Sequence, residues 1–197
     1  MGRCPITVKI IGVTQRNLCV DFYKRIEEIS KYDLDYLILR EKDLNDEELE
    51  NMANKIKSIF EGSQIKLIIN GNINVAIKTN AYGVQLSFKD FCGGIGHGFL
   101  GIKGVSVHSL KEALISEKKG ADYLLYGHIY ETDCKKELAP RGVEKLKEIC
   151  ESVKIPVYAI GGINEKNFHQ ILEVGALGIA LMSSLMRGFS IDAFRSI

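Results

Sequence analysis

Eight short apolar runs recur along this chain, and a helix-like stretch follows nearly every one. The runs are mostly continuous rather than alternating, which is typical of parallel strands covered on both faces. Each strand and its helix together take about 25 residues. Strands are expected at residues 6–13, 34–39, 65–69, 82–86, 102–107, 123–126, 156–160 and 177–182. This repetition predicts a single α/β domain over residues 1–197, closed into a (β/α)8 barrel.

An open, doubly wound sheet is the alternative arrangement of alternating strands and helices. Dinucleotide-binding sheets of that kind carry G-x-G-x-x-G in their first strand-to-helix turn. The corresponding turn here reads Ile11-Gly-Val-Thr-Gln-Arg16, which lacks the fingerprint. The barrel is therefore favoured.

Polar residues that accept backbone hydrogen bonds mark the expected starts of three helices. Asn45 precedes an acidic first turn, Ser109 begins the S-x-x-E pattern of a capping box, and Asn164 follows the strand at 156–160. The first helix is expected from about Val20, with Val20 itself on the apolar stripe.

Charge and composition exclude some classes of partner. The 197 residues carry a net charge of +1, and no basic stripe or DNA-binding helix is visible, so no nucleic-acid partner is expected. No apolar run approaches the roughly 18 residues that a membrane span needs. Without a signal peptide, and with five cysteines in no paired spacing, the chain is expected in the cytoplasm with reduced thiols. The sequence is compatible with a homodimer.

Barrel enzymes place their chemistry at the carboxyl ends of the strands. Polar residues occur wherever a strand gives way to a loop. Only the kinds of polar residue found at these ends therefore carry information about function. Here the strand ends carry Arg40, Lys42, Asn70, Gln85, Ser106, His108, His128, Gly161, Gly162 and Ser183.

Two of these ends have the features of a phosphate cradle. Gly161-Gly162 follows the seventh strand, and Met182-Ser183 leads into a helix after the eighth. Adjacent backbone amides at such places bind anions, and barrels commonly hold phosphate there. The alternative is that the two glycines only permit a tight turn.

His128 closes the sixth strand, ahead of a polar loop that holds Thr132, Cys134 and Lys135. An imidazole at this place can carry protons near neutral pH, or it can be a packed side chain bonded to a carbonyl. Both interpretations stay open on position alone. His108 is expected to have a structural role, because it precedes a helix cap.

The sequence shows no metal-ligand motif. Asp90 is the one carboxylate just past the fourth strand. A single carboxylate makes a weak magnesium site, because Mg²⁺ usually takes one or two together with substrate phosphates. The residues by themselves therefore do not favour a metal site.

Over nearly its whole length the chain resembles the thiamine phosphate synthase superfamily. The resemblance lies in Leu39–Asp43, Ile68–Asn70, Gly104–Ser109, Gly120–Tyr123 and Ala159–Ile163. Synthases usually carry an aspartate that binds magnesium where this chain has Gly71. They also carry a glutamine at Ile38, and Gly-Pro at Gly127-His128.

The loop from Gly127 to Lys136 instead resembles the TenI-type thiazole tautomerases. That resemblance implies isomerisation of a thiazole phosphate to its aromatic tautomer, with His128 as the general acid and base. It implies no cofactor. The remaining roles are binding of the substrate by Arg40, Lys42, Asn70, Ser106, Thr132 and Lys135, and of its phosphate by Gly161, Gly162, Met182 and Ser183.

Two other functions are weighed against the tautomerase. A thiamine phosphate synthase would couple a pyrimidine diphosphate with a thiazole phosphate in the presence of magnesium, and Gly71 argues against it. A non-catalytic regulator would bind a thiamine-related phosphate without turning it over.

Overall fold

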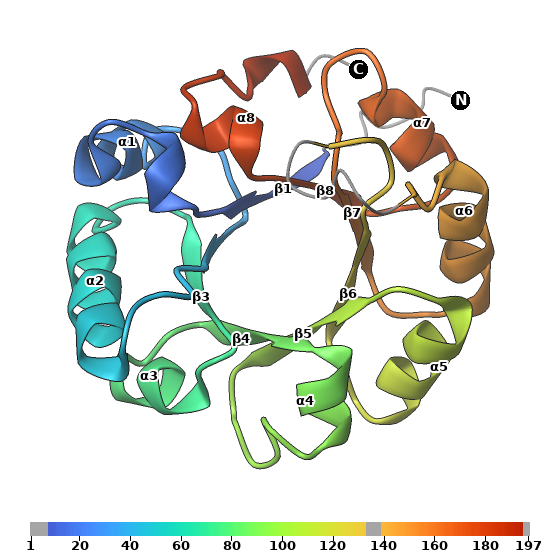
Figure 1. Cartoon of the computed structure of the whole chain (residues 1–197), viewed down its shortest axis with the longest axis horizontal. Helices are drawn as coiled ribbons and strands as arrows, with labels where there is room; N and C mark the ends of the chain where they lie inside the picture. The colour runs from blue at the N-terminus through green and yellow to red at the C-terminus, as the bar shows by residue number, and fades with distance from the viewer. Residues whose placement is uncertain (1–7, 133–138, 195–197) are drawn as a thin grey trace.

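The computed structural model describes residues 8–132 and 139–194, and it confirms the predicted barrel. Eight parallel strands pair in sequence order, and β8 pairs with β1 to close the sheet (Figure 1). The strands are β1 (Lys9–Val13), β2 (Tyr36–Leu39), β3 (Lys66–Asn70), β4 (Gly83–Ser87), β5 (Ile102–Val107), β6 (Tyr123–Gly127), β7 (Val157–Ile160) and β8 (Gly178–Leu181).

Helices surround the barrel as an outer ring (Figure 1). They are α1 (Phe22–Ile29), α2 (Asp46–Ile59), α3 (Ile73–Lys78), α4 (Phe88–Cys92), α5 (Leu110–Lys118), α6 (Val143–Ser152), α7 (Phe168–Glu173) and α8 (Ser183–Met186), with 3-10 turns η1 (Arg16–Leu18) and η3 (Asp192–Phe194). Within the described part of the chain, none of the helices is long and apolar enough to cross a membrane.

The apolar core has two parts, one on each side of the sheet. The larger part lies between the strands and the helices, and the smaller part fills the barrel. Inside the barrel, Tyr123 stacks on Tyr36 with ring centroids 6.2 Å apart and meets Tyr158 edge-on at 5.6 Å. Tyr36 and Tyr123 are the first residues of their strands, so these rings close the amino-terminal end of the barrel. The carboxyl end is left for a site.

The predicted helix caps have mixed outcomes. Asn45 is confirmed, because its side chain accepts from the Glu48 amide while the Glu48 carboxylate accepts from the Asn45 amide. Ser109 caps α5 as predicted, but the Glu112 carboxylate accepts from the amide of His108, at 2.7 Å, and not from that of Ser109. Only half of that capping box forms.

The prediction for Asn164 is wrong. Its side-chain oxygen accepts from the Lys166 amide at 2.9 Å inside a turn, and α7 begins later, at Phe168. The prediction for Val20 is also wrong, because Asp21 caps α1 by accepting from the Lys24 amide. Val20 therefore precedes the helix and is fully exposed.

Candidate active site

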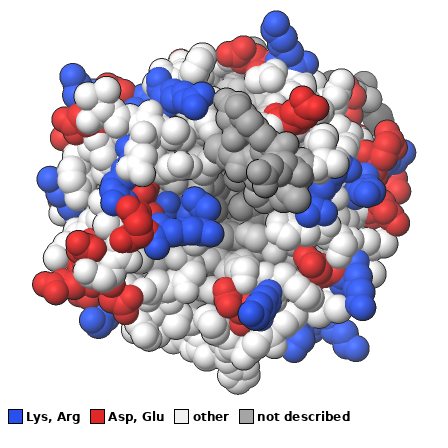
Figure 2. All heavy atoms as spheres, viewed as in Figure 1, with Lys and Arg blue, Asp and Glu red and all other residues white. Residues whose placement is uncertain are grey.

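A cavity of about 1460 Å³ opens at the carboxyl ends of the strands. Figure 2 shows the molecule hollowed near the middle of this view, with Lys and Arg atoms to one side of the hollow. The residues that sequence analysis assigned to substrate and phosphate, and that the structure describes, all border the cavity: Arg40, Lys42, Asn70, Ser106, Thr132, Gly161, Gly162, Met182 and Ser183. His128 borders it too. Lys135 and Cys134 lie outside the described residues.

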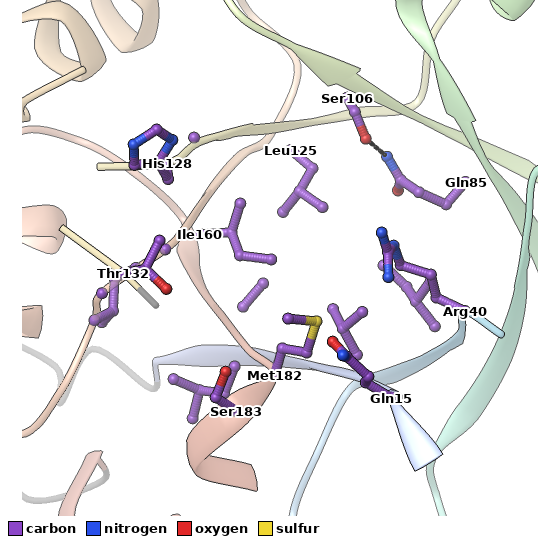
Figure 3. A pocket seen from close by; sticks show the side chains of 18 of the residues that line it. Gln15, Arg40, Gln85, Ser106, Leu125, His128, Thr132, Ile160, Met182 and Ser183 are labelled. Atoms are coloured by element: carbon purple, nitrogen blue, oxygen red, sulfur yellow. Dashed lines mark hydrogen bonds between the residues drawn. The ribbon is translucent and has the colours of Figure 1, made fainter. Parts of the chain in front are cut away.

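Arg40 and Lys42 form the cationic wall of the cavity, just after β2. The Arg40 amide donates to the Thr14 hydroxyl at 2.9 Å, which ties this loop to the end of β1. Figure 3 shows the Arg40 side chain projecting into the cavity, across from His128 and Thr132. This wall can therefore attract an anionic ligand.

Arg16 pairs with the two carboxylates beside that wall and offsets one of their two negative charges. Its guanidinium donates to buried Glu41 at 3.2 Å and to both oxygens of Asp43, at 2.7 and 2.5 Å. Its hydrogen bond and charge hold the pKa of the Asp43 carboxyl below the usual value. Because Arg16 holds both carboxylates and offsets one of their charges, they compete less with a ligand for the neighbouring Arg40 and Lys42.

The polar floor of the cavity was only partly foreseen. Gln85 stands on β4 and Ser106 on β5, and the Gln85 amide donates to the Ser106 hydroxyl at 2.9 Å (Figure 3). Gln85 was expected at a strand end, with no role assigned to it. Its partner Tyr123 was missed, because a tyrosine that begins an apolar strand carries no local sign of a polar contact.

The Gly161-Gly162 turn lies against the loop that follows β6. Both glycines have positive φ, at +102° and +68°. A Cβ on Gly161 would stand 2.8 Å from the His128 Cα, and one on Gly162 would stand 2.7 Å from the Tyr130 Cβ. The tight-turn interpretation thus has direct structural support. Phosphate binding by this turn stays a prediction.

His128 is only 4% exposed, and Figure 3 shows it on the same side of the cavity as Thr132, across from Arg40. The loop around it is held by Arg141, whose Nε donates to the Gly127 carbonyl at 2.9 Å. The Arg141 Nη1 also donates to the His108 carbonyl at 2.6 Å. His108 contacts the same Gly127 carbonyl through Nδ1 at 3.1 Å. Because His108 also borders the cavity, its structural role stays a prediction.

Two positions near the ends of β3 and β4 bear on metal binding. Asp90 borders the cavity, and its Oδ2 accepts from the Ser87 hydroxyl at 2.6 Å. Gly71 also borders the cavity, and a Cβ built there would meet nothing within 4 Å. Across residues 8–132 and 139–194, no group of three or more His, Cys, Asp or Glu side chains could hold a metal ion.

A family model described as thiamine monophosphate synthase matches residues 10–185, which is most of the barrel. The chain belongs to this family. A member from Clostridium acetobutylicum, named thiamine-phosphate synthase, is 40% identical over 92% of this chain and 88% of its own length. A second, from Clostridium tetani and with the same name, is 37% identical over 88% of this chain and 86% of its own length.

Solved structures related to the thiamine monophosphate synthase family share the same architecture. The structure named thiamine phosphate pyrophosphorylase from Pyrococcus furiosus superposes with a TM-score of 0.82 at 33% identity, covering 93% of this chain and 90% of its own. Another, from Bacteroides thetaiotaomicron, has a TM-score of 0.66 at 22% identity, with 93% and 87% coverage, and supports the fold alone.

These relatives overturn the expectation of a TenI-type tautomerase. The similarity to proteins named thiamine-phosphate synthase extends over 92% of the chain, whereas the tautomerase interpretation depended on one loop after β6. Part of that loop, residues 133–138, lies outside the described residues. The role of His128 as the general acid and base of an isomerase falls with that interpretation. What the structure shows of His128 is a buried side chain whose backbone packs against Gly161.

Proposed function

We propose that this protein is a thiamine-phosphate-forming transferase, which joins a pyrimidine diphosphate to a thiazole phosphate and releases pyrophosphate. One observation carries the proposal. A single cavity has Arg40 and Lys42 on one wall and the Gly161-Gly162 turn with Ser183 on another. Two anionic substrates need two such regions. The family relatives named thiamine-phosphate synthase support the same conclusion.

The size of the cavity suits a reaction between two molecules. At about 1460 Å³ it exceeds the roughly 300–1,000 Å³ typical of sites for one small ligand. We assign the diphosphate to the wall of Arg40 and Lys42, because a diphosphate carries more charge than a monophosphate and gains more from two cations. The thiazole phosphate then takes the amides of Gly162 and Ser183, as neutral donors suffice for it.

In the proposed reaction the thiazole nitrogen bonds to the methylene carbon of the pyrimidine, and the bond from that carbon to the diphosphate oxygen breaks. The nitrogen supplies its lone pair, and the leaving pyrophosphate takes the electron pair of the broken bond. The protein contributes positioning of the two rings and stabilisation of negative charge on the leaving group. Arg40 is the residue that we expect to carry the second contribution.

Magnesium fits this site only with help from the substrate. Asp90 is a carboxylate at the cavity wall, and Mg²⁺ is commonly held by one or two carboxylates together with substrate phosphates. Asp90 would hold the ion on the protein side, and the diphosphate would supply further ligands. The ion would neutralise charge on the leaving pyrophosphate. The sequence argued against a metal on two grounds, the lone carboxylate of Asp90 and the resemblance to the tautomerases. In the proposed reaction the diphosphate would supply the ligands that Asp90 alone lacks.

Purified protein is expected to form thiamine phosphate from the two substrates in the presence of Mg²⁺, and to stop when EDTA is added. Chromatographic detection of the product against time measures this directly. Restoration of the rate by excess Mg²⁺ is the control for EDTA. Tight binding of thiamine phosphate with no coupling by the wild-type protein would contradict the proposal and favour the non-catalytic regulator.

Gly71→Asp is expected to lower the Mg²⁺ concentration needed for half-maximal rate by about three- to tenfold, because it adds a second carboxylate near Asp90. A Cβ at position 71 meets nothing within 4 Å, so the new side chain has room. The positive φ of +76° costs the variant about 1 kcal/mol of stability. Gly71→Asn is the matched control, since it has the same shape without the charge. Equal magnesium dependence in the two variants would contradict this prediction.

A further inference from the structure

Tyr123 is a buried phenol beneath the floor of the cavity. It is the first residue of β6 and is 3% exposed. Its hydroxyl donates to the Gln85 Oε1 at 2.6 Å. Burial raises the pKa of this phenol well above its ordinary value, so the hydroxyl keeps its proton at neutral pH.

The contact between Tyr123 and Gln85 depends on the strand between them. Gly104 on β5 pairs with Gln85 on one side and with Tyr123 on the other. A Cβ at Gly104 would overlap both the Tyr123 ring and the Gln85 amide oxygen. The missing side chain is therefore what lets the phenol reach across β5. The arrangement is built by three neighbouring strands and is not an incidental surface contact.

The phenol determines which way the Gln85 amide faces. With Oε1 turned to Tyr123, the Nε2 group faces Ser106 and donates to its hydroxyl at 2.9 Å. In the reversed orientation, the amide would present hydrogens to the phenol, which would then lose its acceptor. The Tyr123 hydroxyl is buried, since the residue is only 3% exposed, and leaving a buried hydroxyl without an acceptor is costly. The observed orientation is therefore the favoured one.

A hydroxyl that accepts one hydrogen bond still has its own proton to give. Ser106 borders the cavity and is partly exposed. We propose that Tyr123 and Gln85 are positioning residues that make Ser106 a hydrogen-bond donor toward the bound substrate. The chain of donors runs from Tyr123 through Gln85 to Ser106 and then to the ligand. It selects a ligand that places an acceptor atom over the floor.

The acceptor is best assigned to an uncharged ring nitrogen of the pyrimidine, an assignment that rests on the proposed function. Apolar Ile38 and Leu125 border the same cavity and suit the faces of a ring. Arg40 and Lys42, which carry the positive charge, are assigned to the diphosphate. A ring analogue with carbon in place of that nitrogen would face the Ser106 proton without accepting it. We therefore expect this floor to discriminate against such analogues.

The orientation of the Gln85 amide can be measured without any ligand. In the full-length wild-type protein, nuclear Overhauser contacts from the Gln85 side-chain NH2 are expected to reach the Ser106 β protons. They should be weaker to the ring protons of Tyr123. The reverse pattern would overturn the proposal. In Tyr123→Phe, which keeps the ring but removes the hydroxyl, the preference for Ser106 should weaken.

A double-mutant cycle tests the effect on binding of the pyrimidine diphosphate, measured as Kd by calorimetry. Ser106→Ala should weaken binding about tenfold, and Tyr123→Phe about three- to tenfold. The double variant should bind no more weakly than Ser106→Ala alone, because no proton remains to be oriented. Tyr158→Phe is the matched control, as it removes another buried phenol hydroxyl from the same ring cluster, and it should leave Kd unchanged.

If the double variant raised Kd by the product of the two single effects, the proposal would be overturned, and the two substitutions would be separate packing defects.

The proposed function and the positioning role of Tyr123 and Gln85 can fail separately. A protein that binds the pyrimidine diphosphate with the expected cycle but forms no thiamine phosphate defeats the proposed function alone. A protein that couples the substrates but shows independent effects defeats the positioning role alone.

Discussion

Arg40→Met is expected to lower kcat/KM for thiamine phosphate formation by about 10²–10³-fold. The substitution removes the guanidinium that borders the cavity and keeps most of the length of the side chain. The rate should fall because the leaving diphosphate loses the positive charge that stabilises it. The fold should survive, because the Arg40 contact to Thr14 is made by the backbone amide. Steady-state kinetics with saturating Mg²⁺ measure the effect.

Two comparisons make the Arg40 prediction specific. Lys66→Met removes an exposed cation at the start of β3, at the opposite end of the barrel, and should leave the rate unchanged. Arg40→Lys should recover part of the lost activity, since it restores the charge without the fork geometry. Turnover of Arg40→Met within threefold of the wild type would show that the diphosphate is bound elsewhere.

Gly161→Ala is expected to cost about 2–4 kcal/mol of stability, because it combines an unfavourable φ with overpacking. The new Cβ would stand 2.8 Å from the His128 Cα, so the two loops must separate. For a chain of this length the thermal midpoint should fall by about 5–15 °C. Affinity for thiazole phosphate should fall as well, since the amides assigned to its phosphate move with the turn.

Gly188→Ala separates the two causes of that loss. Gly188 has a φ of +95°, close to the +102° of Gly161, but a Cβ there meets nothing within 4 Å. It should therefore lose only about 1 kcal/mol, the cost of the backbone conformation. Thermal unfolding of both variants measures the difference. Equal midpoints would show that His128 and Gly161 do not pack as closely as described.

The barrel was predictable because its evidence is local. Parallel strands buried on both faces appear as continuous apolar runs, so β5 (Ile102–Val107) was predicted to the residue and the other strands were predicted with shifted ends. Helix starts were less certain, since several polar residues near a start compete for the same amides. At α2 the competition favoured Asn45, as expected, whereas Asn164 bonded within its own turn and left α7 to begin four residues later.

The candidate site was partly predictable for a related reason. Once a closed parallel barrel is accepted, all strand ends face one cavity, so Arg40, Ser106 and Gly161 could be grouped without coordinates. The function was harder to predict. The Gly-His step and its loop favoured a tautomerase, yet the similarity over the whole chain is to proteins named thiamine-phosphate synthase. A short motif in one loop was outweighed by the rest of the barrel.

The strands, the barrel as the favoured class and the residues around the mouth were predictable from the sequence. Apolar runs and turn residues are local signals, and eight strand–helix units favour a closed barrel. The partners of those residues follow only from the folded structure. Tyr123 bonds to Gln85, 38 positions away, and Arg141 reaches the His108 carbonyl, 33 positions away. Such contacts depend on the register of neighbouring strands and on the space that Gly104 and Gly161 leave, and no local pattern encodes either.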